Sequence, residues 1–491
     1  MKRFYQILTL IFFVPALVMA QQQSKQTFTL DECIQYALQN SVNAKNAILD
    51  QEIAENVILE RKSEGLPQIN GNVTLQHNQK LAPNFFKKQI AFGFSQGDKT
   101  PEAYQNFLPN LGDNDVVTVP NFFQLPSNGT AGITVNQLIF NSSYFLGLRA
   151  MKTYRELAVK TTEQTKQQII INVTKAYYGV LINKDRLSLF DNNIARVDSL
   201  LRNTKALNTN GFAEGIDVDR ITVTLNNLQS ERDKFYNLQD LGIQLLKFQM
   251  NYPMDQAFDV SGDIATIQID LEVVKSYSSG WNYDQRIDYK ILDTNFKLQE
   301  LDIRSKRARS VPTLNAFYNI GYTTQSNNIA GLFKTNSIIP NDPAYSSYGA
   351  DKWYQYSNFG VTLRVPIFSG LQQHAVMQQA KLNQAKLENS FTQLKSSIDV
   401  EIKQSSVSYA NAIQSLKSQE ANKGLAEKIA RITKIKYQQG VGSNIEVIDA
   451  ESSLKETQIN YYNALYDALI AKVDLDKAYG KLTPTTPEDN K

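Results

Sequence analysis

Two carboxylates that follow a glycine-containing turn are the side chains in this sequence best placed to act on charge. Two glycines in residues 440–444 allow the chain to reverse between helices, and Ser443 or Asn444 can cap the helix that follows. Glu446 and Asp449 then fall three apart on one face of that helix. Acids in a first turn also complement the helix dipole, at under about 1 kcal/mol each. From these residues alone, both a cation-attracting site and a purely helix-stabilising role remain open.

Residue types that support catalysis or metal binding are not grouped in the sequence. His77 and His374 fall in a predicted strand and at a predicted helix start, and the single cysteine cannot complete a zinc site with them. The chain has no Gly-x-x-x-x-Gly-Lys-Ser/Thr motif, so we expect no nucleotide-binding loop. The sequence therefore predicts no enzyme, no cofactor and no bound metal.

The first twenty residues, MKRFYQILTLIFFVPALVMA, have the basic start, apolar run and small-residue end of a secretory signal peptide. Cleavage is expected before Gln21. Loss of Lys2 and Arg3 lowers the formal net charge from +3 to +1, so the charge does not indicate nucleic-acid binding.

Cys33 lacks the small residues that precede a lipidated cysteine, and we expect it to pack inside a helix.

Proline positions allow two very long helical tracts. Residues 127–252 and 367–483 contain no proline. A single helix from Ser142 to about Asn208 would measure roughly 100 Å, which no compact globular domain accommodates. Apolar residues in the second tract keep coiled-coil spacing, at Leu387, Phe391, Leu394, Ile398 and Ile402 and again at Leu425, Ile429 and Ile432. The positions between them are mostly polar, so these narrow stripes predict long helices that pack as coiled coils.

Four segments alternate apolar and polar residues with the period of a β-strand. They lie at about 66–78, 130–141, 311–324 and 357–369. A core-packed antiparallel sheet produces the same alternation, but about ten residues is also the length that a tilted membrane-barrel strand requires. Beyond the signal peptide no run of about 18 apolar residues occurs, so a membrane role would need a β-barrel.

The chain is expected to be an internal duplication. NSVNAKNAILDQEIAENVILERKSEGLPQIN from Asn40 aligns without a gap with QRIDYKILDTNFKLQELDIRSKRARSVPTLN from Gln285, and NGFAEGIDV from Asn210 aligns with QGVGSNIEV from Gln439. We therefore predict a first structural repeat at 21–253, a second at 254–482 and a flexible tail at 483–491. Each repeat contributes a helix, two strands and long helices.

Four strands are too few to close a barrel, since small barrels need about eight and are then filled by side chains. Several copies must share one barrel, and three copies would give twelve strands. A different class, a secreted coiled-coil structural or adhesive protein of the cell surface, explains the signal and the helices but not the paired halves. A periplasmic enzyme or binding protein is the weakest alternative, since catalytic groups are not clustered.

The sequence resembles the outer membrane efflux (TolC-like) family from Phe28 to Gly480. The motifs are FTLDECIQYALQNS, the strand entries GLPQING and SVPTLNA, the exits LIFNSS and PIFSGL, the turn YQQGVGSNIEVIDAE and the end KAYGKL. The resemblance implies a mainly α fold with β: a long antiparallel α-helical coiled-coil barrel and four strands per chain in a trimeric, 12-stranded transmembrane β-barrel.

The resemblance also implies roles for individual residues. Glu446 and Asp449 match the family's acidic rings at the inner constriction, which would favour cations. Asp217 matches the acid of the first-repeat turn, and Tyr437 matches a tyrosine that helps hold the inner helices closed. Gly442 stands where the family has an arginine partner, so this latch is expected to be weaker or built differently. The turn residues expected to contact an adaptor are Gly211, Gly215, Gly440, Gly442 and Ser443.

The function implied by the resemblance is an outer-membrane exit duct of a tripartite efflux or type I secretion system. Its expected partners are two further copies in a homotrimer, a periplasmic adaptor (membrane fusion) protein, an inner-membrane pump of RND, ABC or MFS type, and outer membrane lipid. The duct would sit in the cell outer membrane with its tunnel in the periplasm. Energy for transport must then come from the pump.

Overall fold

The computed structural model describes residues 26–87, 112, 114–119, 121, 124–262, 264, 272–334, 336–338 and 349–482. The predicted signal peptide and C-terminal tail lie outside these residues. The chain divides into two compact units. Unit 1 comprises Met1–Ala54, Tyr154–Phe296 and Ala385–Lys491, and unit 2 comprises Glu55–Thr153 and Lys297–Gln384.

The described chain is mainly helical with some sheet, as the sequence predicts. The helices are α1 (Leu30–Asn40), α2 (Val42–Ser63), α5 (Ser142–Thr209), α6 (Gly215–Met250), α7 (Glu272–Ser278), α8 (Ile287–Ala308), α9 (Gln372–Gln438) and α10 (Asn444–Ala478), with short 3₁₀ turns η2 (Tyr283–Gln285) and η3 (Ile329–Phe333). At about 1.5 Å per residue, the 68 residues of α5 extend roughly 100 Å. No helix within the described ranges is both long and apolar enough to cross a membrane.

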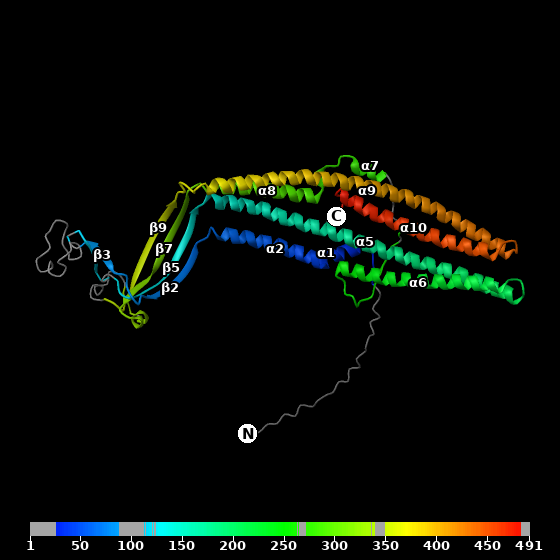
Figure 1. Ribbon diagram of the computed structural model, residues 1–491, viewed down its shortest axis with the longest axis horizontal. Helices are drawn as coiled ribbons and strands as arrows, with labels where there is room; N and C mark the ends of the chain where they lie inside the picture. Colours follow the sequence, from blue (N-terminus) through cyan, green and yellow to red (C-terminus); the bar gives the residue numbers. More distant parts are fainter. Residues whose placement is uncertain are drawn as a thin grey trace, which may run out of the picture. The chain divides into compact units, whose positions relative to one another are not determined.

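Unit 1 contains two helical hairpins, α5 with α6 and α9 with α10, and both reverse direction at the same end of the unit (Figure 1). A small parallel pair, β1 (Gln26–Phe28) with β6 (Phe258–Val260), lies near the far end of α6. The hydrophobic core beside this strand pair contains Cys33, Val173 and Leu246, which are fully buried. Burial raises the pKa of the Cys33 thiol to about 12, so the cysteine is a packed helix residue as predicted.

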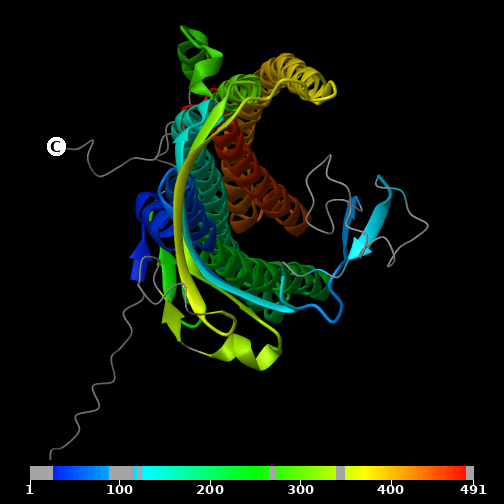
Figure 2. The same ribbon diagram turned by 90° about the vertical axis from the view of Figure 1, so that its left-hand side faces the viewer.

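Unit 2 is built on a five-stranded sheet with the order β2–β5–β7–β9–β8. Its strands are β2 (Gln68–His77), β5 (Ser127–Phe140), β7 (Thr313–Ser326), β9 (Trp353–Arg364) and the two-residue β8 (Ser337–Ile338). The four long strands are antiparallel, and the sheet is strongly curved (Figure 2). A separate hairpin pairs β3 (Asn84–Lys87) with β4 (Val116–Val119).

The strand register places most apolar residues of the four long strands on one face, with Leu138 and Phe317 as exceptions. Residues directly opposite one another include Val73 and Ala131, Ile133 and Ile320, Tyr318 and Phe359, and Ala316 and Val361. Several of these side chains are exposed: Val73 by 72%, Phe359 by 84% and Val361 by 64%. The other face carries polar pairs such as Asn319, whose Nδ2 donates to Asn358 Oδ1 at 2.8 Å. The sheet therefore presents an uncovered apolar surface within the described chain.

Two details differ from the sequence-based expectation. The last long strand starts at Trp353 and ends at Arg364, before Val365–Phe368, because Pro366 has no N–H with which to continue the ladder. The stripe Leu425, Ile429 and Ile432 is 60%, 56% and 45% exposed, whereas Ile398 is buried and the other members of its stripe are half-buried. Ala426 and Ala430 pack against α10 in place of those larger residues.

Candidate functional site

Each helical hairpin reverses through the same backbone motif. Gly211 and Gly440 adopt positive φ values of 80° and 75°. In the first turn Phe212 N–H donates to Leu207 C=O at 2.9 Å, and in the second turn Val441 N–H donates to Lys436 C=O at 3.0 Å. These bonds define Schellman caps at the ends of α5 and α9, where glycine avoids the strain of a left-handed residue.

The residues beside the two glycines complete the turns in different ways. Gly215 begins α6 and has open space around it, whereas a Cβ on Gly442 would lie 3.1 Å from Lys436 Cβ. Ser443 is the N-cap of α10, because its Oγ accepts from Glu446 N–H at 3.3 Å. Asn444 instead is buried and donates from Nδ2 to Asp217 C=O at 3.1 Å, which joins the two turns.

The two predicted acids lie on the exposed side of α10. Glu446 and Asp449 are both exposed, while Val447 and Ala450 between and beside them are buried. Asp217 is half-buried in the first turn of α6. Glu446 and Asp449 therefore share a solvent-facing surface directly above the turn, and Asp217 lies on the neighbouring helix.

Tyr437 joins the two hairpins through a residue that was not identified from the sequence. Its hydroxyl lies 3.0 Å from Thr204 Oγ1 on α5. The partner of the Tyr437 hydroxyl is thus Thr204, a fully buried residue. The available sequence signal was that Thr204 continues the three-and-four spacing of Val197 and Leu200, where an apolar residue is expected.

A line of polar side chains continues along the contact between α5 and α10. Arg196 donates from Nε and Nη2 to Glu451 Oε2 at 3.2 and 3.1 Å. Asn193 accepts from Arg196 Nη2 and donates from Nδ2 to Gln458 Oε1 at 3.3 Å. We call Asn193, Arg196, Glu451 and Gln458 the polar seam. The sequence signal lies on α10, where Glu451 and Gln458 continue the three-and-four spacing of the buried residues Val447 and Leu454. Apolar residues are expected at such positions.

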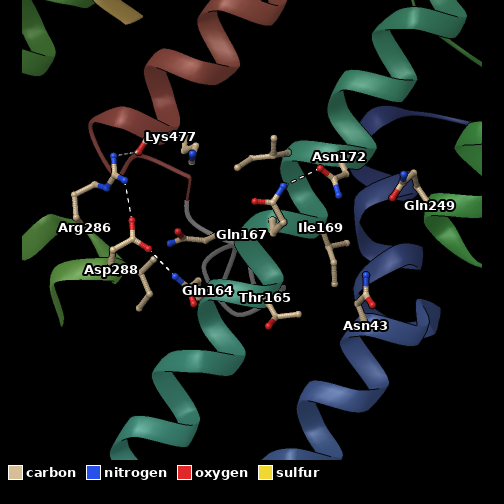
Figure 3. A pocket seen from close by; sticks show the side chains of 13 residues that line it. Asn43, Gln164, Thr165, Gln167, Ile169, Asn172, Gln249, Arg286, Asp288 and Lys477 are labelled. Carbon is tan, nitrogen blue, oxygen red and sulfur yellow. Dashed lines mark hydrogen bonds and ion pairs between the residues drawn. The ribbon is translucent and has the colours of Figure 1, made fainter. Parts of the chain in front are cut away.

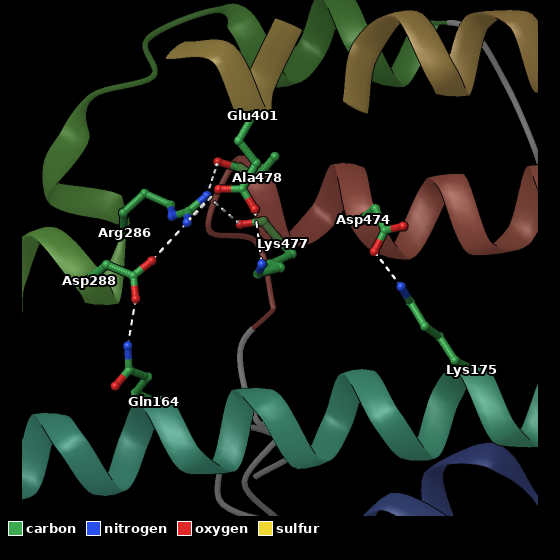
Figure 4. Close-up of polar contacts among 8 residues, drawn as sticks. All are labelled: Gln164, Lys175, Arg286, Asp288, Glu401, Asp474, Lys477 and Ala478. Atoms are coloured by element: carbon green, nitrogen blue, oxygen red, sulfur yellow. Dashed lines mark hydrogen bonds and ion pairs between the residues drawn. The ribbon is translucent and has the colours of Figure 1, made fainter. Parts of the chain in front are cut away.

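A second charged cluster surrounds Arg286 where α8 begins and α10 ends. Arg286, 5% exposed, donates from Nη1 to Lys477 C=O at 3.3 Å and Ala478 C=O at 3.0 Å (Figure 4). Its Nη2 lies 2.8 Å from both Asp288 Oδ2 and Glu401 Oε2. A guanidinium at this place satisfies the terminal carbonyls and complements the negative end of the α10 dipole.

The Arg286 cluster borders a polar cavity of about 370 Å³ in unit 1 (Figure 3). Amide side chains from α5 dominate its wall, among them Gln164, Gln168 and Asn172. Gln164 donates to Asp288 Oδ1 at 2.6 Å, and Gln168 donates to Asn172 Oδ1 at 2.8 Å. Within the described residues, no group of three or more His, Cys, Asp or Glu side chains is placed to hold a metal ion.

Comparison with known proteins finds relatives among outer membrane efflux proteins. A family model described as outer membrane efflux protein matches residues 295–481. The outer membrane protein TolC of Salmonella enteritidis is 22% identical over 436 residues, covering 86% of this chain and 83% of the relative. The chain is therefore similar to the outer membrane efflux family over residues 295–481, and to TolC over most of its length. Both the family model and the matched TolC proteins are described as outer membrane proteins.

Solved structures of outer membrane proteins share the fold of the chain. The outer membrane protein VceC of Vibrio cholerae superposes with a TM-score of 0.64 at 15% identity, covering 92% of this chain and 96% of VceC. The CmeC outer membrane channel of Campylobacter jejuni gives 0.65 at 15% identity, with coverage of 94% and 87%. At this coverage the match extends over both units of the chain.

Proposed function

We propose that three copies of this chain form the exit duct of a tripartite efflux or type I secretion system. The duct would combine a twelve-stranded transmembrane barrel, four strands from each copy, with an α-helical tunnel in the periplasm. It would receive substrates from an inner-membrane RND, ABC or MFS-type pump through a periplasmic adaptor. The secreted coiled-coil alternative is not retained, because the matched family is an efflux family.

The unpaired edges of the unit 2 sheet carry this proposal. Among the described strands, β2 is paired on one side, and β9 has only the two-residue β8 on its second side. A long open edge with exposed apolar residues invites pairing with another chain. If β2 of one copy paired with β9 of the next, three copies would close a ring of twelve strands. The exposed apolar face would then meet lipid, and the polar face would line the lumen.

Exposed helical stripes in unit 1 support the same homotrimer. On α6, Leu241, Leu245 and Phe248 are 63%, 50% and 68% exposed. With Leu238 they keep the three-and-four spacing of a coiled-coil seam. The α9 stripe of Leu425, Ile429 and Ile432 is exposed in the same way. In a ring of three, each copy contacts two neighbours and therefore needs two contact surfaces. The exposed stripes on α6 and α9 would supply them.

Matching junctions in the two halves support the internal duplication, with repeats at 21–253 and 254–482. Asn251 ends α6 in the left-handed region, with φ 55°, and donates from Nδ2 to Asn40 C=O at 3.1 Å. Gly480 follows α10 with φ 68°, and a Cβ there would lie 2.5 Å from Gln285 C=O. Asn40 and Gln285 are the residues that the sequence alignment of the halves pairs.

The gate of the proposed duct lies at the two turns. Glu446 and Asp449 would supply six carboxylates around the threefold axis, a density that favours cations. Asp217 would stand beside them, and Tyr437 would help hold the turn region closed through its bond to Thr204. The adaptor would contact the exposed turn surface at Gly211, Gly215, Gly440, Gly442 and Ser443.

Single-channel conductance in planar bilayers tests the proposed function. The detergent-purified wild type is compared with Glu446→Ala/Asp449→Ala and with a charge-matched control, Asp240→Ala/Glu420→Ala. The control removes two exposed acids of α6 and α9 that lie far along these helices from the turns. We expect small, cation-preferring steps that grow and lose their preference in the gate variant but not in the control. A folded wild type without channels would refute the duct, and equal selectivity in all three proteins would refute the acidic gate.

A further inference from the structure

The polar seam interrupts a contact that is otherwise apolar. The α5 stripe runs Phe190, Asn193, Val197, Leu200 and Thr204, with spacings of three and four, and every member is buried. Val447 and Leu454 of α10 are 1% and 4% exposed, and the side chain of Glu451 between them is 9% exposed. A carboxylate in such a stripe lowers stability unless it is paired, and in return it fixes which residues face each other.

Other contacts of α10 in this region lack a comparably buried charge. The face toward α9 is formed by Ala426, Ala430, Ala450 and Leu454. Toward α6, Lys455 Nζ lies 3.1 Å from Glu231 Oε1, and these side chains are 27% and 40% exposed. In the seam pair Arg196 is 32% exposed, so the difference lies in the carboxylates, 9% exposed for Glu451 and 40% for Glu231. Among the described ion pairs of α10 near the turn, Arg196 with Glu451 thus has the most to lose from separation of the helices.

We propose that the Arg196–Glu451 pair is a latch that holds α10 against α5 and thereby sets the free energy of gate opening. This inference rests on the proposed gate. Glu446 and Asp449 precede Glu451 on the same helix by five and two residues, about 8 and 3 Å along its axis. Movement of α10 away from α5 would therefore carry both acids with it. Arg196 is thus a positioning residue: it holds Glu451, and through α10 it positions Glu446 and Asp449.

The latch predicts an asymmetry between its two partners. Arg196→Met leaves a buried carboxylate without its cation, and that carboxylate gains water only when α10 moves away from α5. Glu451→Gln keeps the shape and an acceptor oxygen, so it should weaken the contact less. The double variant Arg196→Met/Glu451→Met replaces the pair by apolar side chains and should restore closure.

The test measures open probability and conductance in planar bilayers for these three variants and for Glu231→Gln, the matched control at the exposed pair. We expect Arg196→Met to raise open probability by about tenfold or more. We expect a smaller rise for Glu451→Gln, and values within about twofold of wild type for the double variant and the control. Thermal unfolding of each detergent-solubilised variant is recorded beside the channel measurement, and Glu451→Gln decides the outcome if Arg196→Met fails to fold.

Two results would overturn the latch. Arg196→Met and Glu451→Gln could both gate like wild type while Glu446→Ala/Asp449→Ala changes selectivity; the duct would then stand without this latch. A lower unfolding temperature with unchanged gating would show that the pair only stabilises the fold. A folded wild type without channels would instead refute the proposed function itself, so the two failures are distinguishable.

Discussion

Replacing Arg286 by methionine should destabilise unit 1 far more than replacing an exposed arginine. The guanidinium is 5% exposed and contacts two carboxylates and two helix-terminal carbonyls, so its loss removes a donor from four acceptors. Glu401 keeps Lys477 Nζ at 3.0 Å, and Asp288 keeps the hydrogen bond from Gln164. Loss of one partner from a buried ion pair costs about 3–5 kcal/mol. Asp288 and Glu401 keep 30% exposure, so water offsets part of this cost. We expect the free energy of unfolding to fall by about 2–4 kcal/mol.

Guanidinium-induced unfolding of the detergent-solubilised protein, followed by helical circular dichroism, measures this loss. Arg202→Met is the matched control, because Arg202 is 72% exposed and pairs with Asp198 one turn away. That substitution should cost under about 0.5 kcal/mol. Arg286→Lys should fall between the two, since lysine keeps the charge but not the planar fork. Arg286→Met within about 0.5 kcal/mol of the control would refute the assigned role of the cluster.

Two further predictions concern the sheet and the buried thiol. Gly321→Ala should destabilise the sheet by about 1–3 kcal/mol, because its Cβ would lie 2.5 Å from Ala131 C=O and 2.7 Å from Gly132 Cα. Gly71→Ala, with nothing within 4 Å, is the control, and equal unfolding midpoints of the two variants would contradict this prediction. Burial raises the pKa of Cys33 from 9.0 to about 12, so the thiol contributes stability below pH 9 that is lost as the pH rises toward 12. Cys33→Ala should show a smaller decline in stability over that window, and rapid native-state alkylation of Cys33 would exclude the burial on which this rests.

The helices and strands were predictable because their signals are local. Proline-free tracts permitted α5 and α9, and alternation of apolar and polar residues marked β2, β5, β7 and β9. The stripe at Leu425, Ile429 and Ile432 shows the limit of such signals. Its spacing predicts a helix contact but does not identify the partner, and within the chain the smaller Ala426 and Ala430 face α10.

The polar seam was missed because its partners are remote in sequence. Arg196 and Glu451 are 255 residues apart, and each alone has the composition of an exposed helix residue. Their pairing depends on the relative position of two hairpins, which no local pattern encodes. The one detectable feature was a break in an apolar stripe. Glu451 and Gln458 occupy positions at which the spacing of Val447 and Leu454 predicts apolar residues.

Two arginines contact α10 near its opposite ends, and together they define its position along its own axis. Near the turn, three of the four residues that pack between α9 and α10 are alanines (Ala426, Ala430 and Ala450, with Leu454), and such small side chains define the axial position of the helix weakly. Arg196 contacts α10 at Glu451, and Arg286 contacts it at Ala478, 27 residues later, or about 40 Å along the axis. A slip of α10 by one turn, about 5.4 Å, would break both contacts at once. The charged groups therefore add axial specificity to the apolar packing of α10, and the exposed acids Glu446 and Asp449 lie on the same helix as both contacts.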